Sequence, residues 1–140
     1  MDLEFTIDAL DFVHAGEAAS RVKRTLEHVG MEREVVRRAS IAAYEAEMNI
    51  VIHSVGGTMK VTILPDCVEI VATDRGPGIE DIDLAMQEGY STAPPHIREM
   101  GFGAGMGLPN MKRCADDIRI ESAPGRGTTV RVIIRPRHAA

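Results

Sequence analysis

The sequence has no tryptophan, and only 4% of its residues are aromatic. Its two cysteines, Cys67 and Cys114, lie far apart without a C-x-x-C motif or a histidine pair, which argues against a zinc site and a disulfide framework. No apolar run approaches the roughly 18 residues that a membrane span needs, and the acidic amino terminus is unlike a secretory signal. We therefore expect a cytoplasmic protein with two reduced thiols and no membrane contact.

An excess of positive charge is also missing. Sixteen Lys and Arg residues stand against 21 Asp and Glu residues, a net charge of -5, which argues against a nucleic-acid partner. The chain has no Gly-Lys pair and hence no Walker A loop, and it lacks the H-R-D and D-F-G motifs of protein kinases. Its 140 residues, 44% of them hydrophobic, predict a single domain over 1–140 with an aliphatic core.

Apolar periodicity predicts helices and strands along most of the chain. The strands expected are 2–8, a hairpin of 58–64 and 67–73, 117–122 and 128–135, and the helices are 11–29, 32–53 and 107–114. Residues 76–107 hold seven of the 13 glycines, a density typical of a functional loop. This order favours an α+β fold, a two-layer sandwich in which helices cover one face of a mixed, mostly antiparallel sheet.

The helix over 32–53 carries Glu45 and Asn49 four residues apart, so both side chains belong to one helical face. A carboxylate and an amide presented together suit base catalysis and the coordination of Mg²⁺. Taken alone, the pair is more typical of a solvated helix surface. Glu47 lies two residues from Asn49 and faces elsewhere, so Glu45 is the expected base.

Two glycine-rich segments follow. Asp74 ends a predicted strand before Arg-Gly-Pro-Gly-Ile (75–79), where glycines let the backbone approach a ligand closely, although a plain turn has the same pattern. In Gly-Phe-Gly-Ala-Gly-Met-Gly (101–107), glycines precede a helix, so N–H groups can converge on phosphate oxygens. A flexible surface loop is the competing interpretation. The dinucleotide-binding fingerprint is not expected, because the sequence of residues 93–100 does not predict a strand and the glycine spacing differs.

Together and in this order, the three segments resemble the N, G1 and G2 boxes of the GHKL superfamily, over about residues 35–135. Residues 45–53, Glu-Ala-Glu-Met-Asn-Ile-Val-Ile-His, resemble the N box of bacterial switch kinases and anti-sigma factors. Residues 85–92, Ala-Met-Gln-Glu-Gly-Tyr-Ser-Thr, and the Gly-Leu-Pro of 107–109 resemble the RsbT branch. The resemblance implies a Bergerat-type ATP-binding fold with a lid over about 79–104, although residues 93–100 depart from the family's lid.

The resemblance also implies roles for single residues. Glu45 would be the general base and Asn49 the ligand of Mg²⁺, while Asp74 would bond the adenine amino group and Thr128 would help bind adenine. The other nucleotide-contacting residues that it implies are Asn49, His53, Gly76, Gly78, Ile79, Gly103, Ala104, Gly105, Met106, Gly107 and Leu108. His53 fits a helix-end histidine facing solvent equally well.

The resemblance implies that the chain is a serine/threonine kinase, which would use ATP and Mg²⁺, with ADP as product, to phosphorylate a STAS-domain regulatory protein. Added phosphate would control that partner's associations. Three alternatives remain: an anti-sigma factor that sequesters a sigma factor, the ATP-binding part of a histidine kinase, and an ATP-binding module without catalysis. His14 lacks the H-E-x-x-T-P-like context of a phosphoacceptor histidine. A downstream phosphatase and a second copy of the chain, forming a homodimer, stay open as partners.

Overall fold

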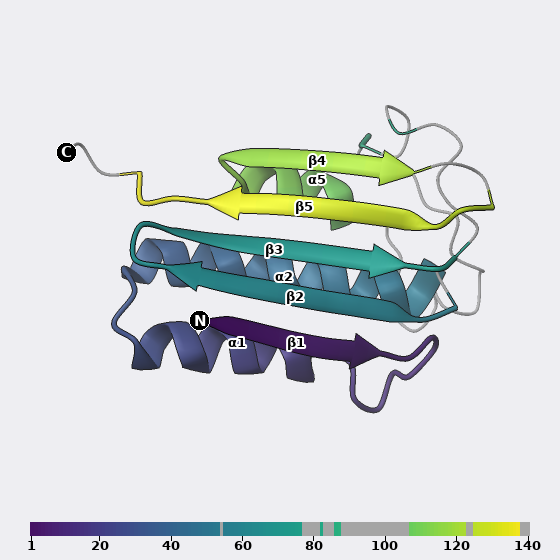
Figure 1. Ribbon diagram of the computed structural model, residues 1–140, viewed down its shortest axis with the longest axis horizontal. Coiled ribbons are helices and arrows are strands. Elements are labelled where there is room, and N and C mark those ends of the chain that lie inside the picture. The colour runs from purple at the N-terminus through teal and green to yellow at the C-terminus, as the bar shows by residue number, and fades with distance from the viewer. Residues whose placement is uncertain (54, 77–81, 83–85, 88–106, 123–124, 138–140) are drawn as a thin grey trace.

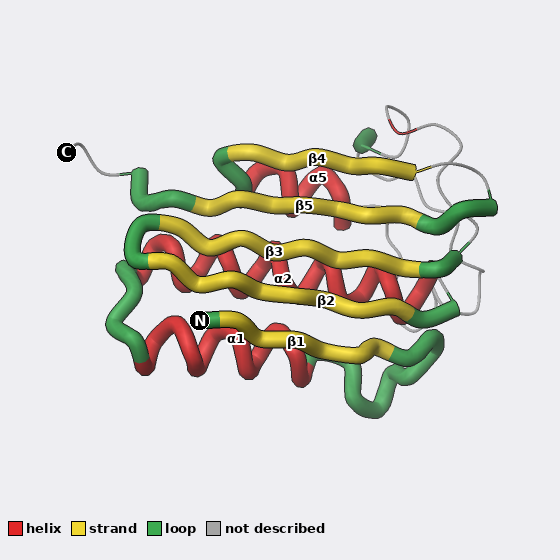
Figure 2. The backbone as a smooth tube through the Cα atoms, in the orientation of Figure 1, coloured by secondary structure: helices red, strands yellow, loops and turns green. Residues whose placement is uncertain are grey.

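The computed structural model describes residues 1–53, 55–76, 82, 86–87, 107–122 and 125–137. Figures 1 and 2 show these residues as one sheet with helices packed behind it. In chain order the elements are β1 (Asp2–Ile7), α1 (Glu17–His28), α2 (Arg33–His53), β2 (Gly57–Leu64), β3 (Cys67–Asp74), α5 (Gly107–Cys114), β4 (Asp117–Ser122) and β5 (Thr128–Ile134).

The sheet has the strand order β1-β2-β3-β5-β4, and every neighbouring pair is antiparallel. The helices α1, α2 and α5 lie on one face of it (Figure 1), so the predicted α+β two-layer sandwich is confirmed. At one end of the sheet, Asp74 pairs with Gly57 of β2 and with Thr128 of β5, and Thr128 pairs with Ser122 of β4. This end therefore aligns residues from four strands.

The predicted elements agree with the structure to within one residue at their ends, except at the start of the first helix. The prediction that this helix begins at Asp11 is wrong, because α1 begins at Glu17. The segment before α1 contains two residues with positive φ, Leu10 (φ 58°) and Gly16 (φ 96°). A right-handed helix does not contain such left-handed backbone conformations. The Asp11 carboxylate also accepts the His14 N–H at 3.2 Å, which stabilises a local turn.

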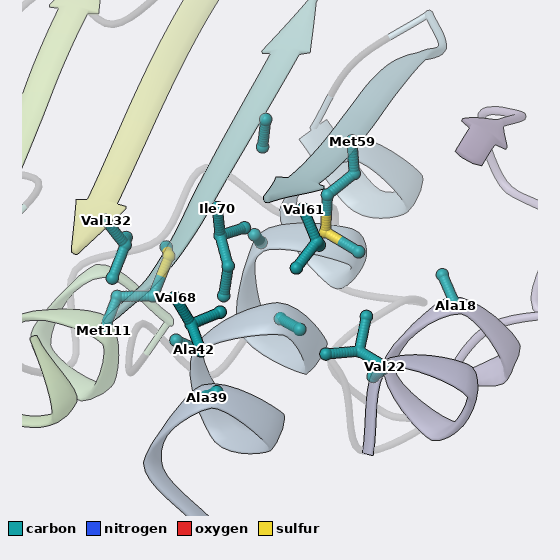
Figure 3. Close-up of a cluster of buried hydrophobic side chains, with 14 of the residues drawn as sticks. Ala18, Val22, Ala39, Ala42, Met59, Val61, Val68, Ile70, Met111 and Val132 are labelled. Carbon is teal, nitrogen blue, oxygen red and sulfur yellow. The ribbon is translucent and has the colours of Figure 1, made fainter. Parts of the chain in front are cut away.

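The core lies between the sheet and α2, and it is built from aliphatic side chains and methionines (Figure 3). Small residues on α2 let the helix approach the sheet closely, since four of them are fully buried: Ala39, Ala42, Ala43 and Ala46. Strands β2 and β3 alternate buried and more exposed residues, which places one face of each against the helices. Among the described residues, no helix is both long enough and apolar enough to cross a membrane.

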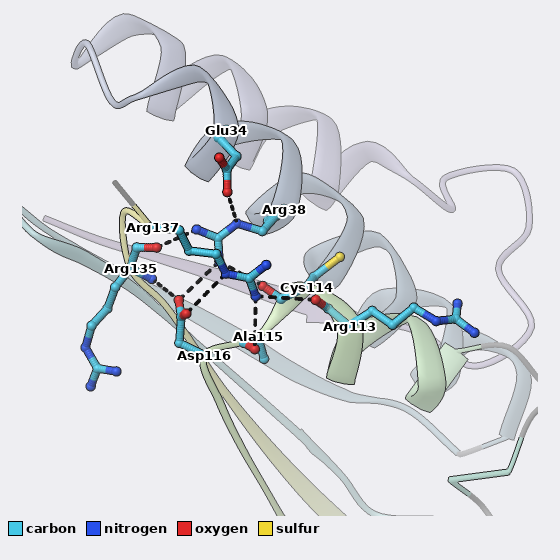
Figure 4. Close-up of polar contacts among 8 residues, drawn as sticks. All are labelled: Glu34, Arg38, Arg113, Cys114, Ala115, Asp116, Arg135 and Arg137. Carbon is cyan, nitrogen blue, oxygen red and sulfur yellow. Dashed lines mark hydrogen bonds and ion pairs between the residues drawn. The ribbon is translucent and has the colours of Figure 1, made fainter. Parts of the chain in front are cut away.

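A buried arginine ties α2 to the ends of α5 and β5 (Figure 4). Arg38 is 1% exposed, and its Nη1 donates to the Cys114 carbonyl at 3.2 Å and to Asp116 Oδ2 at 3.1 Å. Its Nη2 donates to the Arg135 carbonyl, and its Nε forms an ion pair with Glu34 at 3.2 Å. Both Nη atoms of the guanidinium are therefore hydrogen-bonded, and Nε, which makes no hydrogen bond, lies against the Glu34 carboxylate, so the buried charge has a counter-ion on two sides.

Asp116 accepts hydrogen bonds from other residues of this cluster besides Arg38. Burial by itself would raise the pKa of this carboxyl, but bonds from the Arg135 N–H, Arg38 and Arg137 outweigh burial and hold the pKa below its usual range. Arg137 Nε lies 3.3 Å from Asp116 Oδ1. The carboxylate thus stays ionised opposite the buried guanidinium, and it holds the chain after β5 against the end of α5.

Candidate active site

Glu45 and Asn49 of α2 lie together against the first residue of α5. A Cβ atom placed on Gly107 would lie 2.9 Å from Asn49 Oδ1 and 3.2 Å from Glu45 Oε2. Both side chains are partly exposed. A larger residue at this position would displace the end of the Asn49 side chain and press on the Glu45 carboxylate, so α5 begins directly against the carboxylate and the amide. The structure thus brings together three of the residues that the sequence analysis selected.

The Glu45 carboxyl is electrostatically unusual. Burial raises its pKa, and a hydrogen bond from Asn110 Nδ2 to Glu45 Oε1, at 3.5 Å, opposes that rise. A carboxylate whose pKa moves towards neutrality is a stronger base than an exposed glutamate, yet it remains ionised above that pKa. Glu45 therefore has the electrostatics of a group that can accept a proton.

Glu47 serves a different purpose. Its side chain is 3% exposed, and its carboxylate accepts N–H groups from Gly16 at 3.0 Å, Ala18 at 3.3 Å and Ala19 at 3.0 Å. These groups belong to the start of α1, where N–H groups lack partners within the helix and a negative charge is favourable. Glu47 therefore joins α1 to α2, and it faces away from Gly107.

Asp74 lies at the aligned end of the sheet, where β3 finishes. Its Oδ1 accepts the Gly76 N–H at 2.8 Å, which fixes the direction of the carboxylate. Gly127 (φ 80°) passes so close to β3 that a Cβ atom there would collide with the Asp74 carbonyl oxygen. The next residue, Thr128, pairs with Asp74 across the strands, and its hydroxyl lies 2.8 Å from the Ser122 hydroxyl. Asp74 and Thr128 are thus neighbours.

Several predicted site residues fall outside this description. Six of the predicted nucleotide-contacting residues lie outside the described ranges: Gly78, Ile79, Gly103, Ala104, Gly105 and Met106. The predicted lid, 79–104, is described only at 82, 86 and 87. His53 is the last residue of α2, and Leu108 is a core residue, 8% exposed, whose side chain packs inward. The contribution of Leu108 to a ligand would come from its backbone.

Sequence reasoning missed Asn110. It lies three residues after Gly107 on α5, so it belongs to the helical face that meets Glu45. The spacing could have indicated an amide beside the glycine, but the contact joins residues 65 positions apart in the sequence.

Residues 14–138 match the family model described as the histidine kinase-, DNA gyrase B- and HSP90-like ATPase. The chain belongs to this family. The match confirms the resemblance to the GHKL superfamily and identifies residues 14–138 as an ATPase-type domain.

Relatives of this ATPase family align over much of the chain. An anti-sigma F factor of Pasteuria penetrans is 34% identical over 144 positions, covering 95% of this chain and 88% of that protein. The serine/threonine-protein kinase RsbT of Bacillus subtilis is 33% identical over 100 positions, 69% of each chain. An anti-sigma F factor of Caldanaerobacter subterraneus subsp. tengcongensis is 36% identical over 71% of this chain, and the match spans 62% of that relative's length.

Two solved structures share the fold. A chain of the SiaB-SiaC complex from Pseudomonas aeruginosa superposes with a TM-score of 0.64 at 15% identity, covering 94% of this chain and 88% of that one. A mycobacterial sensor histidine kinase, MprB, superposes with a TM-score of 0.54 at 19% identity, covering 98% of this chain and all of the other. At these identities the likeness establishes the common ATPase fold.

Proposed function

We propose that the chain is a protein serine/threonine kinase that transfers the γ-phosphoryl group of ATP to a Ser or Thr hydroxyl of a STAS-domain regulatory protein. The observation that carries the proposal is the placement of the half-buried Glu45 carboxylate one turn before Asn49, both against Gly107. A relative with 33% identity is named a serine/threonine-protein kinase. We infer that the partner is a STAS-domain protein because residues 45–53, 85–92 and 107–109 resemble motifs of the bacterial switch kinases.

The two ends of ATP would meet different elements. The adenine amino group would donate to the Asp74 carboxylate, which has lone pairs left after accepting the Gly76 N–H. Thr128 lies beside Asp74 and would line the adenine side. The phosphates would lie towards the start of α5, where Gly107 offers a backbone without a side chain. Nucleotide would thus span the aligned sheet end and the α2–α5 contact.

Asn49 is the residue that would hold Mg²⁺. The cation prefers oxygen ligands and keeps several waters, and the Asn49 amide oxygen is a ligand of this kind beside the start of α5. When bound, the metal would neutralise negative charge on the phosphates. Asn49 would therefore supply one oxygen ligand to a Mg²⁺ ion whose other ligands are mostly waters and phosphate oxygens.

In the transfer itself, the partner supplies the nucleophile. Glu45 accepts the hydroxyl proton as the hydroxyl oxygen bonds to the γ-phosphorus, and the bond from that phosphorus to the bridging oxygen breaks, releasing ADP. Because the Glu45 carboxylate lies in a partly buried site, water competes less for its proton-accepting oxygen. The partner gains a phosphomonoester, whose charge then alters its associations.

The direct test is to incubate the full chain with labelled ATP, Mg²⁺ and STAS-domain proteins of the same cell. Acid-stable phosphate on a Ser or Thr of the partner is the expected result. Acid-labile phosphohistidine would favour a histidine kinase, and nucleotide binding without any transfer would reduce the chain to a binding module.

A second function, sequestering a sigma factor, has an observation of its own. The relative that aligns with 95% of this chain is named an anti-sigma F factor. Size-exclusion chromatography with sigma factors of the same cell, in the presence of ADP or ATP, tests this function. Co-elution that the phosphorylatable partner reverses would add sigma-factor binding to the kinase activity.

Asp74→Asn should weaken ATP and ADP binding by about 1–3 kcal/mol, the usual contribution of a hydrogen bond to a charged group. The variant keeps an oxygen that can accept the Gly76 N–H, so the turn should survive. Asp66→Asn, in the exposed turn at the other end of the β2–β3 hairpin, is the matched control. Calorimetry measures both affinities, and an unchanged value for Asp74→Asn would remove this residue from the adenine site.

Asn49→Ala should make nucleotide affinity less sensitive to Mg²⁺, because the metal loses its amide ligand. ADP titrations at a series of Mg²⁺ concentrations measure the effect for the wild type and the variant. Parallel Mg²⁺ curves for the two proteins would place the metal on other ligands.

A further inference from the structure

Asn110 connects the proposed base to an exposed cation on α5. Its Nδ2 donates to Glu45 Oε1 at 3.5 Å, and its Oδ1 accepts from Arg113 Nη1 at 2.7 Å. Asn110 is partly buried and Arg113 is exposed. The Arg113 side chain extends along α5, away from the Arg38 guanidinium (Figure 4), while the Arg113 carbonyl accepts from Arg137 Nη2 at 3.4 Å. The three side chains form a short chain of hydrogen bonds that begins at the surface and ends at Glu45.

Arg113 determines which way the Asn110 amide points. A guanidinium only donates, so the amide oxygen must face it, and the amide nitrogen is then left to face Glu45. An ionised carboxylate only accepts, which makes that nitrogen a matched partner. The reversed amide would set donor against donor at Arg113 and acceptor against acceptor at Glu45. One orientation of the amide therefore satisfies both neighbours.

The two oxygens of Glu45 consequently have different surroundings. Oε1 receives the Asn110 amide, whereas Oε2 faces Gly107, where a Cβ atom would lie 3.2 Å away. Asn49 Oδ1 faces the same glycine. The oxygen without the Asn110 bond is thus the one directed towards the proposed metal ligand and the start of α5.

We propose that Asn110, oriented by Arg113, is a positioning residue that holds Glu45 Oε1 and thereby presents Oε2 to the hydroxyl of the protein substrate. This inference rests on the proposed function, since it assumes that Glu45 is the base. It adds two residues, neither of which contacts substrate, to the machinery of transfer. In this proposal Oε1 of Glu45 accepts the hydrogen bond from Asn110, and Oε2 accepts the proton of the substrate hydroxyl.

The hydrogen bond has a predictable sign in a pH profile. Donation by Asn110 favours the ionised carboxylate, so its loss raises the pKa of Glu45 further above the ordinary range. A general base must be ionised, and the acid limb of the transfer rate then moves to higher pH. Among the described residues, the Cys114 thiol at the end of α5 also senses the charge of Glu45, but burial raises the pKa of this thiol, so the thiol titrates on the alkaline side of the profile. The acid limb therefore belongs to Glu45.

The experiment compares single-turnover transfer from saturating ATP, between pH 5 and 9, in five single variants and one double variant of the full chain. Asn110→Asp keeps the shape but sets an acceptor and a negative charge beside Glu45, so its acid limb should move upward most, with transfer at neutral pH falling about tenfold or more. Asn110→Ala should shift the limb less, in the same direction. Arg113→Met should slow transfer in the wild-type background and have no further effect in Asn110→Ala.

Lys112→Met is the matched control, because it removes an exposed cation from the same turn of α5 and should leave the pH profile unchanged. Glu45→Gln, the fifth variant, separates the two proposals. If it loses transfer while Asn110→Asp keeps the wild-type profile, the positioning role is wrong and the base stands. If it keeps full transfer, both fail. If Asn110→Asp transfers phosphate more slowly but the acid limb of its pH profile does not move, the role of Asn110 is only structural and the inference is overturned.

Discussion

Glu45→Gln should lower phosphoryl transfer to the protein partner by roughly 10²–10⁴-fold, the usual contribution of a positioned general base. Glutamine keeps the volume of the side chain and can still accept a hydrogen bond from Asn110 at one oxygen. It lacks the basic carboxylate, so the substrate hydroxyl loses its proton acceptor. A loose, metaphosphate-like transition state depends less on the base and would place the loss at the lower end of this range.

Nucleotide affinity should survive the same change, because the proposed role of Glu45 is confined to the transfer step. Single-turnover transfer from saturating ATP, with calorimetric ATP affinity on the same preparation, separates the two quantities. Transfer at the wild-type rate by Glu45→Gln would exclude Glu45 as the base.

Glu47→Gln provides the matched control, two residues away on the same helix. Its carboxylate accepts three N–H groups at the start of α1, so the amide should reduce stability and leave transfer per folded molecule unchanged. A loss of transfer matching that of Glu45→Gln would move the assignment of the base to Glu47.

Local patterns were sufficient to predict most of the fold. The alternation in β2 and β3, and the two residues between Leu64 and Cys67, predict the hairpin because each strand has one buried face. The start of α1 was predicted wrongly because the apolar spacing continues through residues 11–16. The left-handed conformation of Leu10 could not be anticipated, since a non-glycine residue rarely adopts it.

The candidate site was only partly predictable. Glu45 and Asn49 share a face by helical spacing alone. Their contact with Gly107 depends on how α5 packs against α2, which no local pattern specifies. The same limit applies to Asn110, whose partner Glu45 lies 65 positions away, and to Glu47, whose partner Gly16 lies 31 positions away. The roles of side chains that form hydrogen bonds between distant parts of the sequence therefore could not be predicted without the structure.

Arg38 is the strongest case, because its hydrogen-bond partners lie 76 to 97 residues further along the chain. Within the sequence it is one of two adjacent arginines in a helix, and only its neighbour, Arg37, is exposed. The structure places Arg38 between the carbonyls of Cys114 and Arg135 and the Asp116 carboxylate. The guanidinium therefore joins α2 to the ends of α5 and β5.

Arg38→Met should lower the free energy of unfolding by about 3–5 kcal/mol, the usual cost of removing one partner of a buried ion pair. Methionine fills part of the space but leaves the Cys114 and Arg135 carbonyl oxygens without the Arg38 donor, and Asp116 keeps its bonds from Arg135 and Arg137 but loses the buried guanidinium. Because domains are stable by only about 5–15 kcal/mol, the loss is a large fraction of the total. Urea denaturation at neutral pH measures it through the midpoint, provided that the slope is unchanged.

Two further variants give this prediction its controls. Arg37→Met removes an exposed positive charge one position earlier on α2 and should change the free energy of unfolding by less than about 0.5 kcal/mol. Arg38→Lys keeps the charge but replaces the planar fork by a single ammonium, which cannot reach both sides of the cluster, so its loss should fall between the two. Equal midpoints for Arg38→Met and Arg37→Met would mean that the buried guanidinium contributes no net stability. In that case, its role would be to hold the end of α5, and with it Gly107, in register with Glu45 and Asn49.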